Sequence, residues 1–267
     1  MTAISAADVP ALKLIAQVFN NACREQGITS NQNSLFSAEY SLCVLCGAPT
    51  AGYKYCFSCN NFMRGDYGTL GPDICAPLFY AIEGRQSGTD IYTYKKPLGG
   101  VNRALERMQA VTYLFVKYHL KCLSSAVNSM VTHVVAVPSG RGRANHPLST
   151  ELLPYFGESL IQVEAHRTVP ARTKGRQSVI APSIFELPQF RSTDHVVVLE
   201  DTWVAGASAL SLAVAVRQHG AGVVTIVPLA RLLEPNYDRT RWWLERNDPL
   251  PPYNPEFCPV TRTSECP

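Results

Sequence analysis

The sequence has little charge and no long apolar run, and each shortage argues against a class of protein. Only 17% of the residues are charged and the net charge is +3, which gives no argument for a nucleic-acid or membrane partner. The longest apolar runs are far too short to span a bilayer. The first ten residues lack the basic start and the apolar segment of a signal peptide. We therefore expect a cytoplasmic protein with no membrane partner.

Apolar residues, in contrast, are plentiful. They make up 46% of the 267 residues, so the chain can bury a sizeable core and is not of the disordered class. The length is enough for one large domain or for one domain with a small additional module.

Nine cysteines are unevenly spread, and four of them form two CxxC pairs, CVLC at 43–46 and CFSC at 56–59. Two such pairs can present four thiolates to one tetrahedral Zn²⁺, and a full set of four protein ligands indicates a structural site. Four ordinary buried or redox-active cysteines are the alternative. The predicted zinc ligands are Cys43, Cys46, Cys56 and Cys59.

The remaining cysteines are scattered. The odd total and the absence of an export signal argue against a disulfide framework. We expect these five to be core or surface residues and not ligands: Cys23, Cys75, Cys122, Cys258 and Cys266.

The second half of the chain alternates between apolar runs and helical patterns. The runs predict strands at 131–138, 160–166, 195–200 and 222–230, and the patterns predict helices at 8–27, 101–127, 147–157 and 206–219. Residues 167–178 read as a basic loop, RWWLER (241–246) as helix packing, and the tail after it as irregular. Strands that alternate with helices form a mostly parallel sheet covered on both faces. The fold class we predict is therefore α/β.

An acidic pair, Glu200 and Asp201, ends the predicted strand at 195–200. Ligands bind at the carboxyl ends of parallel strands, where a carboxylate pair can accept hydrogen bonds from a sugar diol. The following turn contains Gly206 and leads into a helix, whose first N–H groups can bind phosphate. Ser208 adds a hydroxyl. The same pattern also fits a strand whose acids cap the next helix, so alone it does not decide the function.

These segments together resemble phosphoribosyltransferases of the type I fold, and more closely the ComF family, which joins a four-cysteine zinc module to such a domain. The stretch VVVLEDTWVAGAS (196–208) resembles the phosphoribosyl diphosphate signature, and VAVPSGRGR (135–143) the diphosphate-binding turn. The segment at 166–177 is similar to the mobile catalytic loop, and IYTYKKPLGG (91–100) to the lysine-bearing segment.

The resemblance implies a site that binds phosphoribosyl diphosphate with Mg²⁺ and transfers its ribosyl phosphate to a nitrogen nucleophile. Glu200 and Asp201 would hold the diol, while Arg172 and Lys174 would close over the site. The implied donor-binding residues are Ser139, Gly140, Arg141, Arg143, Val204, Ala205, Gly206, Ala207 and Ser208.

Two departures from the family pattern bear on activity. Val204 and Ala205 stand where the family has a threonine pair, and Glu200 replaces the first aspartate. A non-catalytic module that senses a nucleotide or binds single-stranded nucleic acid is therefore the alternative, since ComF relatives are associated with DNA uptake. Tyr92, Tyr94, Lys95 and Lys96 would suit such binding, although we expect an ordinary edge strand there.

The expected organisation has four parts. Residues 1–38 form an N-terminal helix and linker, 39–66 a small zinc ribbon, 67–232 the phosphoribosyltransferase-like domain, and 233–267 a C-terminal extension. The sequence is compatible with a homo-oligomer but does not determine one, and no residue identifies the acceptor.

Overall fold

The computed structural model describes residues 29–30, 42–96, 101–140, 145–157, 160–168, 179–247, 250 and 253–267. The helix expected at 8–27 lies outside these residues, as does most of the basic loop at 167–178. Within the described residues, no helix is both long enough and apolar enough to cross a bilayer.

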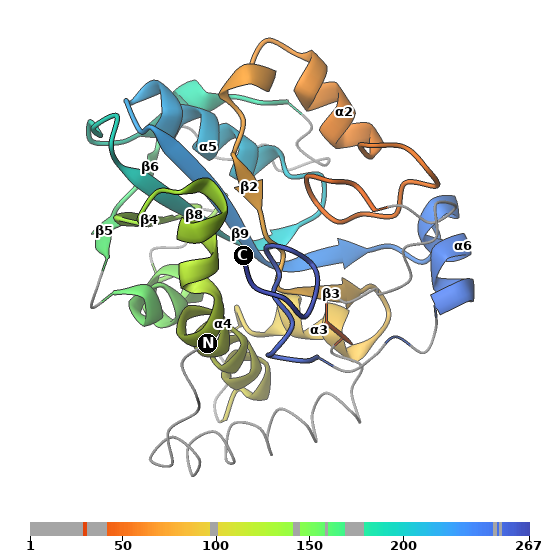
Figure 1. Cartoon of the computed structure of the whole chain (residues 1–267). Helices are drawn as coiled ribbons and strands as arrows, with labels where there is room; N and C mark the ends of the chain where they lie inside the picture. Colours follow the sequence, from red (N-terminus) through yellow and green to blue (C-terminus); the bar gives the residue numbers. More distant parts are fainter. Residues whose placement is uncertain are drawn as a thin grey trace.

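A mostly parallel sheet lies at the centre (Figure 1), in the order β1-β3-β9-β8-β4-β5, with β2 also pairing with β9. Among the described strands of this sheet, only β1 runs antiparallel to its neighbour. The strands are β1 (Thr29–Ser30), β2 (Ile74–Cys75), β3 (Phe79–Ile82), β4 (His133–Ala136), β5 (Ile161–Val163), β8 (His195–Trp203) and β9 (Val223–Leu233). A separate antiparallel pair is formed by β6 (His166–Arg167) and β7 (Phe185–Glu186).

Helices cover both faces of this sheet. They are α2 (Phe57–Arg64), α3 (Gln86–Thr93), α4 (Arg103–Val127), α5 (Ala207–Gln218) and α6 (Asp238–Asn247). Short 3₁₀ turns cover Gly68–Leu70, Leu153–Phe156 and Pro182–Ile184, and Leu148–Leu152 is a π-helical turn. The mostly parallel α/β architecture predicted from the sequence is confirmed.

Alternate residues of the central strand β8 face opposite layers of the core. Val197 and Leu199 pack in one apolar cluster with α4, whereas Val196 and Val198 pack in another with α5. The two helices accordingly lie on opposite sides of the sheet (Figure 1). Burial on both faces explains why the strand is continuously apolar and not alternating.

The cysteine segment packs on the same core as the sheet. Cys43, Cys46 and Cys59 belong to the apolar cluster that contains β8 and α5. The Tyr80 hydroxyl, on β3, donates a hydrogen bond to the Gly47 carbonyl at 2.6 Å. The segment therefore rests directly on the sheet.

Several local expectations are corrected or refined. Strand β8 continues to Trp203, so Glu200 and Asp201 lie inside the strand and not at its end. Residues 92–96 are not an edge strand, because α3 ends at Thr93 and Tyr94 caps it. The expected packing role of 241–246 is confirmed, since Trp243 on α6 is 1% exposed and its ring meets Tyr80 edge-on at 5.5 Å.

Candidate functional site

One cavity of about 440 Å³ contains the acidic pair and the turn that follows it. Strand β8 contributes Glu200, Asp201 and Thr202, and the turn and first residues of α5 contribute positions 204–208. The remaining lining residues come from the ends of neighbouring elements: Glu83, Tyr92, Lys95, Leu232 and Glu234. The parallel sheet thus brings residues 83 and 234 to the same rim as the acidic pair.

Gly206 determines the shape of the turn. Its φ is +81°, in the left-handed region that favours glycine, and a Cβ there would lie 2.2 Å from Cζ2 of Trp203. Helix α5 begins at the next residue, and Leu210 donates its N–H to the Gly206 carbonyl at 2.8 Å. The N–H groups of Ala207 and Ser208 precede that first bond, so they lie where a helix has no internal acceptors. This end of the cavity is suited to an anion.

Asp201 is held by three neighbouring side chains. It is 9% exposed, accepts a hydrogen bond from the Tyr94 hydroxyl at 3.1 Å and forms an ion pair with Lys95. Nε2 of His146 lies 3.6 Å from the same oxygen. Burial alone would raise the pKa of Asp201, but Lys95, His146 and Tyr94 together lower it below its ordinary value. Asp201 is therefore an ionised carboxylate fixed by three neighbours.

Glu200 behaves in the opposite way. Burial raises the pKa of Glu200 well above its ordinary value, and the adjacent charge of Asp201 raises it further. The two carboxyls therefore differ: Asp201 carries the charge, while Glu200 retains a proton to higher pH. Two neighbouring groups with opposite shifts are a common feature of functional sites.

The cavity also contains a buried hydroxyl without a partner. Oγ1 of Thr202 has no hydrogen-bond partner among the described residues. Thr202 could not be selected from the sequence, because it occupies a variable position of the resembled signature.

Charge in the cavity is unbalanced. Glu83, Asp201, Glu200 and Glu234 line it, and Lys95 is the one cation among the described lining residues. An anionic ligand would therefore need a further cation. The carboxylates of Glu200 and Asp201 are the type of ligand with which a protein holds Mg²⁺ together with substrate phosphates.

Other predicted site residues are not brought into this cavity by the described structure. Ser139 and Gly140 follow β4, but they are not among the described lining residues. The predicted cationic residues lie outside the described part of the chain: Arg141, Arg143, Arg172 and Lys174.

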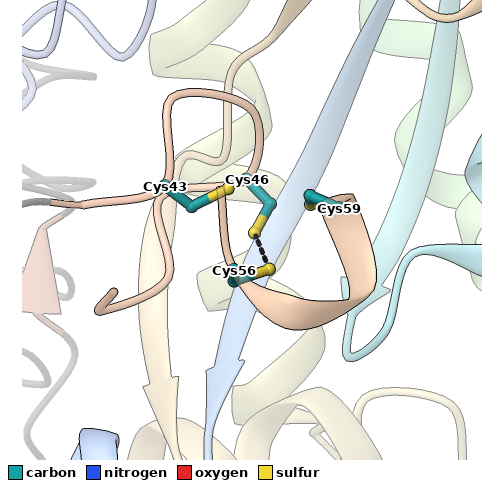
Figure 2. Close-up of side chains that lie close together, drawn as sticks. All are labelled: Cys43, Cys46, Cys56 and Cys59. Carbon is teal, nitrogen blue, oxygen red and sulfur yellow. Dashed lines mark hydrogen bonds between the residues drawn. The ribbon is translucent and has the colours of Figure 1, made fainter. Parts of the chain in front are cut away.

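The four cysteines of the two CxxC pairs lie together, as Figure 2 shows. Their Sγ atoms are all within 4.8 Å of one another, and Cys46 and Cys56 are 3.7 Å apart. Ligands on tetrahedral Zn²⁺ at about 2.3 Å lie roughly 3.8 Å from each other, so the cluster fits such an ion. The second pair lies at the start of a helix, since Cys56 precedes the first residue of α2 and Cys59 lies in its first turn.

A buried arginine lies between this cluster and the cavity turn. Nη1 of Arg231, on β9, donates to the carbonyls of Trp203 at 2.9 Å and Val204 at 3.0 Å. Burial would lower the pKa of Arg231, but the nearby cysteine thiolates, Cys46 first, raise it. The guanidinium therefore connects the thiolate cluster to the backbone of the turn.

No protein-family model matches the chain, and no curated protein matches it. A solved hypoxanthine phosphoribosyltransferase from Staphylococcus aureus is similar to 48% of this chain at 13% sequence identity, with a TM-score of 0.29. The match spans 65% of that protein, less than two thirds of its length. A likeness this weak adds nothing to what the chain's own contacts show.

Proposed function

We propose that this chain is a phosphoribosyltransferase-like protein that binds phosphoribosyl diphosphate with Mg²⁺ and transfers the ribosyl phosphate to a nitrogen nucleophile. One observation carries the proposal: the acidic pair and the start of α5 line the same cavity. A sugar phosphate has a diol at one end and a phosphate at the other. The cavity is lined by carboxylates and by the first residues of α5, whose N–H groups have no acceptor within the helix.

Each lining group has a task that its surroundings support. Asp201, ionised and fixed by Lys95, accepts from a ribose hydroxyl. The N–H groups of Ala207 and Ser208 donate to the 5′-phosphate. Mg²⁺, when bound, neutralises the diphosphate. In the transfer, the bond from C1 to the diphosphate breaks with its electron pair leaving on the diphosphate, a bond from C1 to nitrogen forms, and the nitrogen's proton passes to the released diphosphate or to water. The carboxylate charge stabilises the cationic sugar.

A second candidate function is binding without transfer, and the turn itself favours it. Val204 and Ala205 offer no hydroxyls to the phosphate. A hydrogen bond to a charged group contributes about 1.5–3 kcal/mol, so two missing bonds correspond to roughly 10²- to 10⁴-fold weaker binding. Such a site would serve as a nucleotide sensor.

Single-stranded nucleic acid is a poorer candidate. It requires exposed rings on which bases stack. Tyr94 is 1% exposed and Lys95 is paired with Asp201, so only Tyr92, half exposed at the cavity rim, could supply such a ring in this run.

The test replaces Ser208 with aspartate and measures binding of phosphoribosyl diphosphate with Mg²⁺ by calorimetry. An acid in the first turn of α5 stabilises a helix by about 0.3–1 kcal/mol, but its charge repels the phosphate. We expect binding to weaken at least tenfold while the melting temperature is kept. Ser183→Asp, at an exposed position outside the lining, is the control.

Two results would count against the proposal. One is a parent protein that does not bind phosphoribosyl diphosphate at millimolar concentration. The other is a Ser208→Asp variant that binds as tightly as the parent. If binding is present, diphosphate release in the presence of free nucleobases distinguishes transfer from sensing.

A further inference from the structure

A second group of metal-ligand side chains lies away from the cavity. His119 and Cys122 are three residues apart on α4, so they lie on the same helix face. Cys258 and Cys266 come from the C-terminal tail, which runs beside α4 in Figure 1. The Sγ atoms and one ring nitrogen of this group are all within 4.8 Å of one another. Cys122, Cys258 and Cys266 are far apart in the sequence but are therefore neighbours in the structure.

We propose that His119, Cys122, Cys258 and Cys266 bind a second structural Zn²⁺, which fastens the C-terminal tail to α4. Three thiolates and one imidazole are a common structural zinc set. Four protein ligands fill the tetrahedral shell and leave no place for a reacting water.

The distances agree with a shared ion. With bonds of about 2.3 Å to sulfur and about 2.0–2.1 Å to nitrogen, a tetrahedral Zn²⁺ separates these ligands by roughly 3.6 Å. Nδ1 of His119 lies 3.8 Å from Sγ of Cys122 and 3.7 Å from Sγ of Cys266. The spacing closely matches the 3.7 Å between Cys46 and Cys56 in the first cluster.

The histidine is also oriented as a ligand. Nε2 of His119 lies 2.7 Å from the carbonyl of Pro255. A carbonyl only accepts, so Nε2 carries the proton and Nδ1, which faces the thiols, has a free lone pair. A hydrogen bond from the other ring nitrogen to a backbone carbonyl is the usual support of a metal-binding histidine. His119 is 4% exposed, so this orientation does not depend on solvent.

The tail between the two cysteines forms a closed turn. The Cys258 N–H donates to the Thr263 carbonyl at 2.9 Å, and the Arg262 N–H donates to the Cys258 carbonyl at 2.8 Å. Arg262 has a φ of 59°, which reverses the chain there. Cys258 is fully buried although no helix or strand is described after Asn247. A tail with so little regular structure gains order from a metal crosslink.

The same turn contacts the first cysteine cluster. Nη1 of Arg262 donates to the Cys43 carbonyl at 2.8 Å, and Nη2 donates to the carbonyls of Val44 at 3.2 Å and Leu45 at 3.1 Å. The second site therefore positions a side chain that supports the first zinc loop. Loss of the second ion should loosen the first loop as well.

Elemental analysis of reduced protein purified without chelator tests the second site. We expect two zinc ions per chain in the parent and fewer in Cys258→Ser. Cys266→Ser changes an exposed residue near the end of the chain and is expected to lose zinc while keeping the circular dichroism of the parent. Cys75→Ser, which removes a buried thiol outside both clusters, should keep two ions.

Cobalt substitution distinguishes the two sites. Charge-transfer absorption of the parent should correspond to seven thiolates, and the ion that remains in Cys266→Ser should show four-thiolate coordination. Equal metal content in the parent and both serine variants would overturn the second site. Recovery of Cys258 in a disulfide from protein purified without a reductant would overturn it too. One ion in the parent and none in the serine variants would mean that the second site binds zinc and the first does not.

Discussion

Asp201→Asn tests whether the Asp201 carboxylate stabilises the fold in addition to lining the cavity. The substitution keeps the shape of the side chain and removes its charge. Lys95 would then lose the carboxylate that balances its charge. Because its side chain is only 19% exposed, water solvates the unpaired ammonium incompletely. The Tyr94 hydroxyl can still donate to the amide oxygen, so the change is mainly electrostatic.

The contacts allow an estimate of the cost. Removing one partner of a fully buried ion pair costs about 3–5 kcal/mol. Partial exposure of Lys95 permits water to solvate the unpaired ammonium, so we expect about 2–3 kcal/mol for this pair. For a chain of this length, that loss lowers the melting temperature by roughly 4–12 °C. Scanning calorimetry of ligand-free protein is a suitable assay.

The effect should also depend on pH, with a definite sign. Neighbours lower the pKa of Asp201, so its stabilising contribution is present above the unfolded value of about 3.9 and is lost as pH falls through the lowered folded value. The difference in stability between parent and variant should therefore shrink in acid. Asp238→Asn, which breaks an exposed pair with Arg241, is the matched control and should lower the melting temperature much less than Asp201→Asn does.

Two outcomes would contradict this prediction: both asparagine variants melt at the temperature of the parent, or the effect of Asp201→Asn is as large at pH 3 as at pH 7. Either outcome would mean that the ion pair with Lys95 does not form in solution. If Asp201→Asn then lost ligand binding but kept its stability, the carboxylate would act on the ligand and not on the fold.

Three further predictions concern the same cavity. Gly206→Ala should destabilise the fold by about 3 kcal/mol, because alanine resists a positive φ and its Cβ would displace the buried Trp203; urea unfolding measures this, and an unchanged midpoint contradicts it. Burial raises the pKa of Glu200 in the folded protein, so the stability of the parent should fall as pH rises from the unfolded pKa of Glu200 through its higher folded pKa. Glu200→Gln should remove this fall in urea titrations across pH, and an identical pH dependence of parent and variant would argue against it. Val204→Thr with Ala205→Thr should tighten binding of phosphoribosyl diphosphate by about tenfold or more for each new charge-assisted bond, and unchanged calorimetric affinity in the folded double variant would mean that the turn suits another ligand.

The centre of the fold could be predicted from the sequence because its signals are local. The apolar run of β8 and the small-residue helix α5 are adjacent in the chain, so the acidic pair and the turn had to lie close together. Residues 79–93 were missed for the opposite reason. Strand β3 is short, and α3 contains Gly88 and several residues of weak helix propensity. Packing stabilises α3, where the buried Asp90 pairs with Arg107 of α4 at 2.6 Å.

Long-range contacts account for what could not be predicted. Lys95 meets Asp201 across 106 positions of the chain, and nothing local in either segment indicates the pairing. The second cysteine group is a stronger case. CxxC pairs are recognised because both ligands lie in one short loop, whereas Cys122 and Cys258 are brought together only by the path of the tail. Spacing alone therefore favoured the interpretation of these cysteines as unrelated.

The side chains of Val204 and Ala205 depart from the resembled signature, but other groups determine the shape of the turn at 204–206. Gly206 supplies the left-handed backbone, and Arg231 holds the carbonyls of Trp203 and Val204. Neither contact involves the side chain at 204 or 205. Loss of threonines there would therefore remove hydrogen bonds to a ligand without altering the backbone of the turn. The architecture of a phosphate site can persist in this way while its affinity declines, and restoring the hydroxyls tests the chemistry of the site separately from its folding.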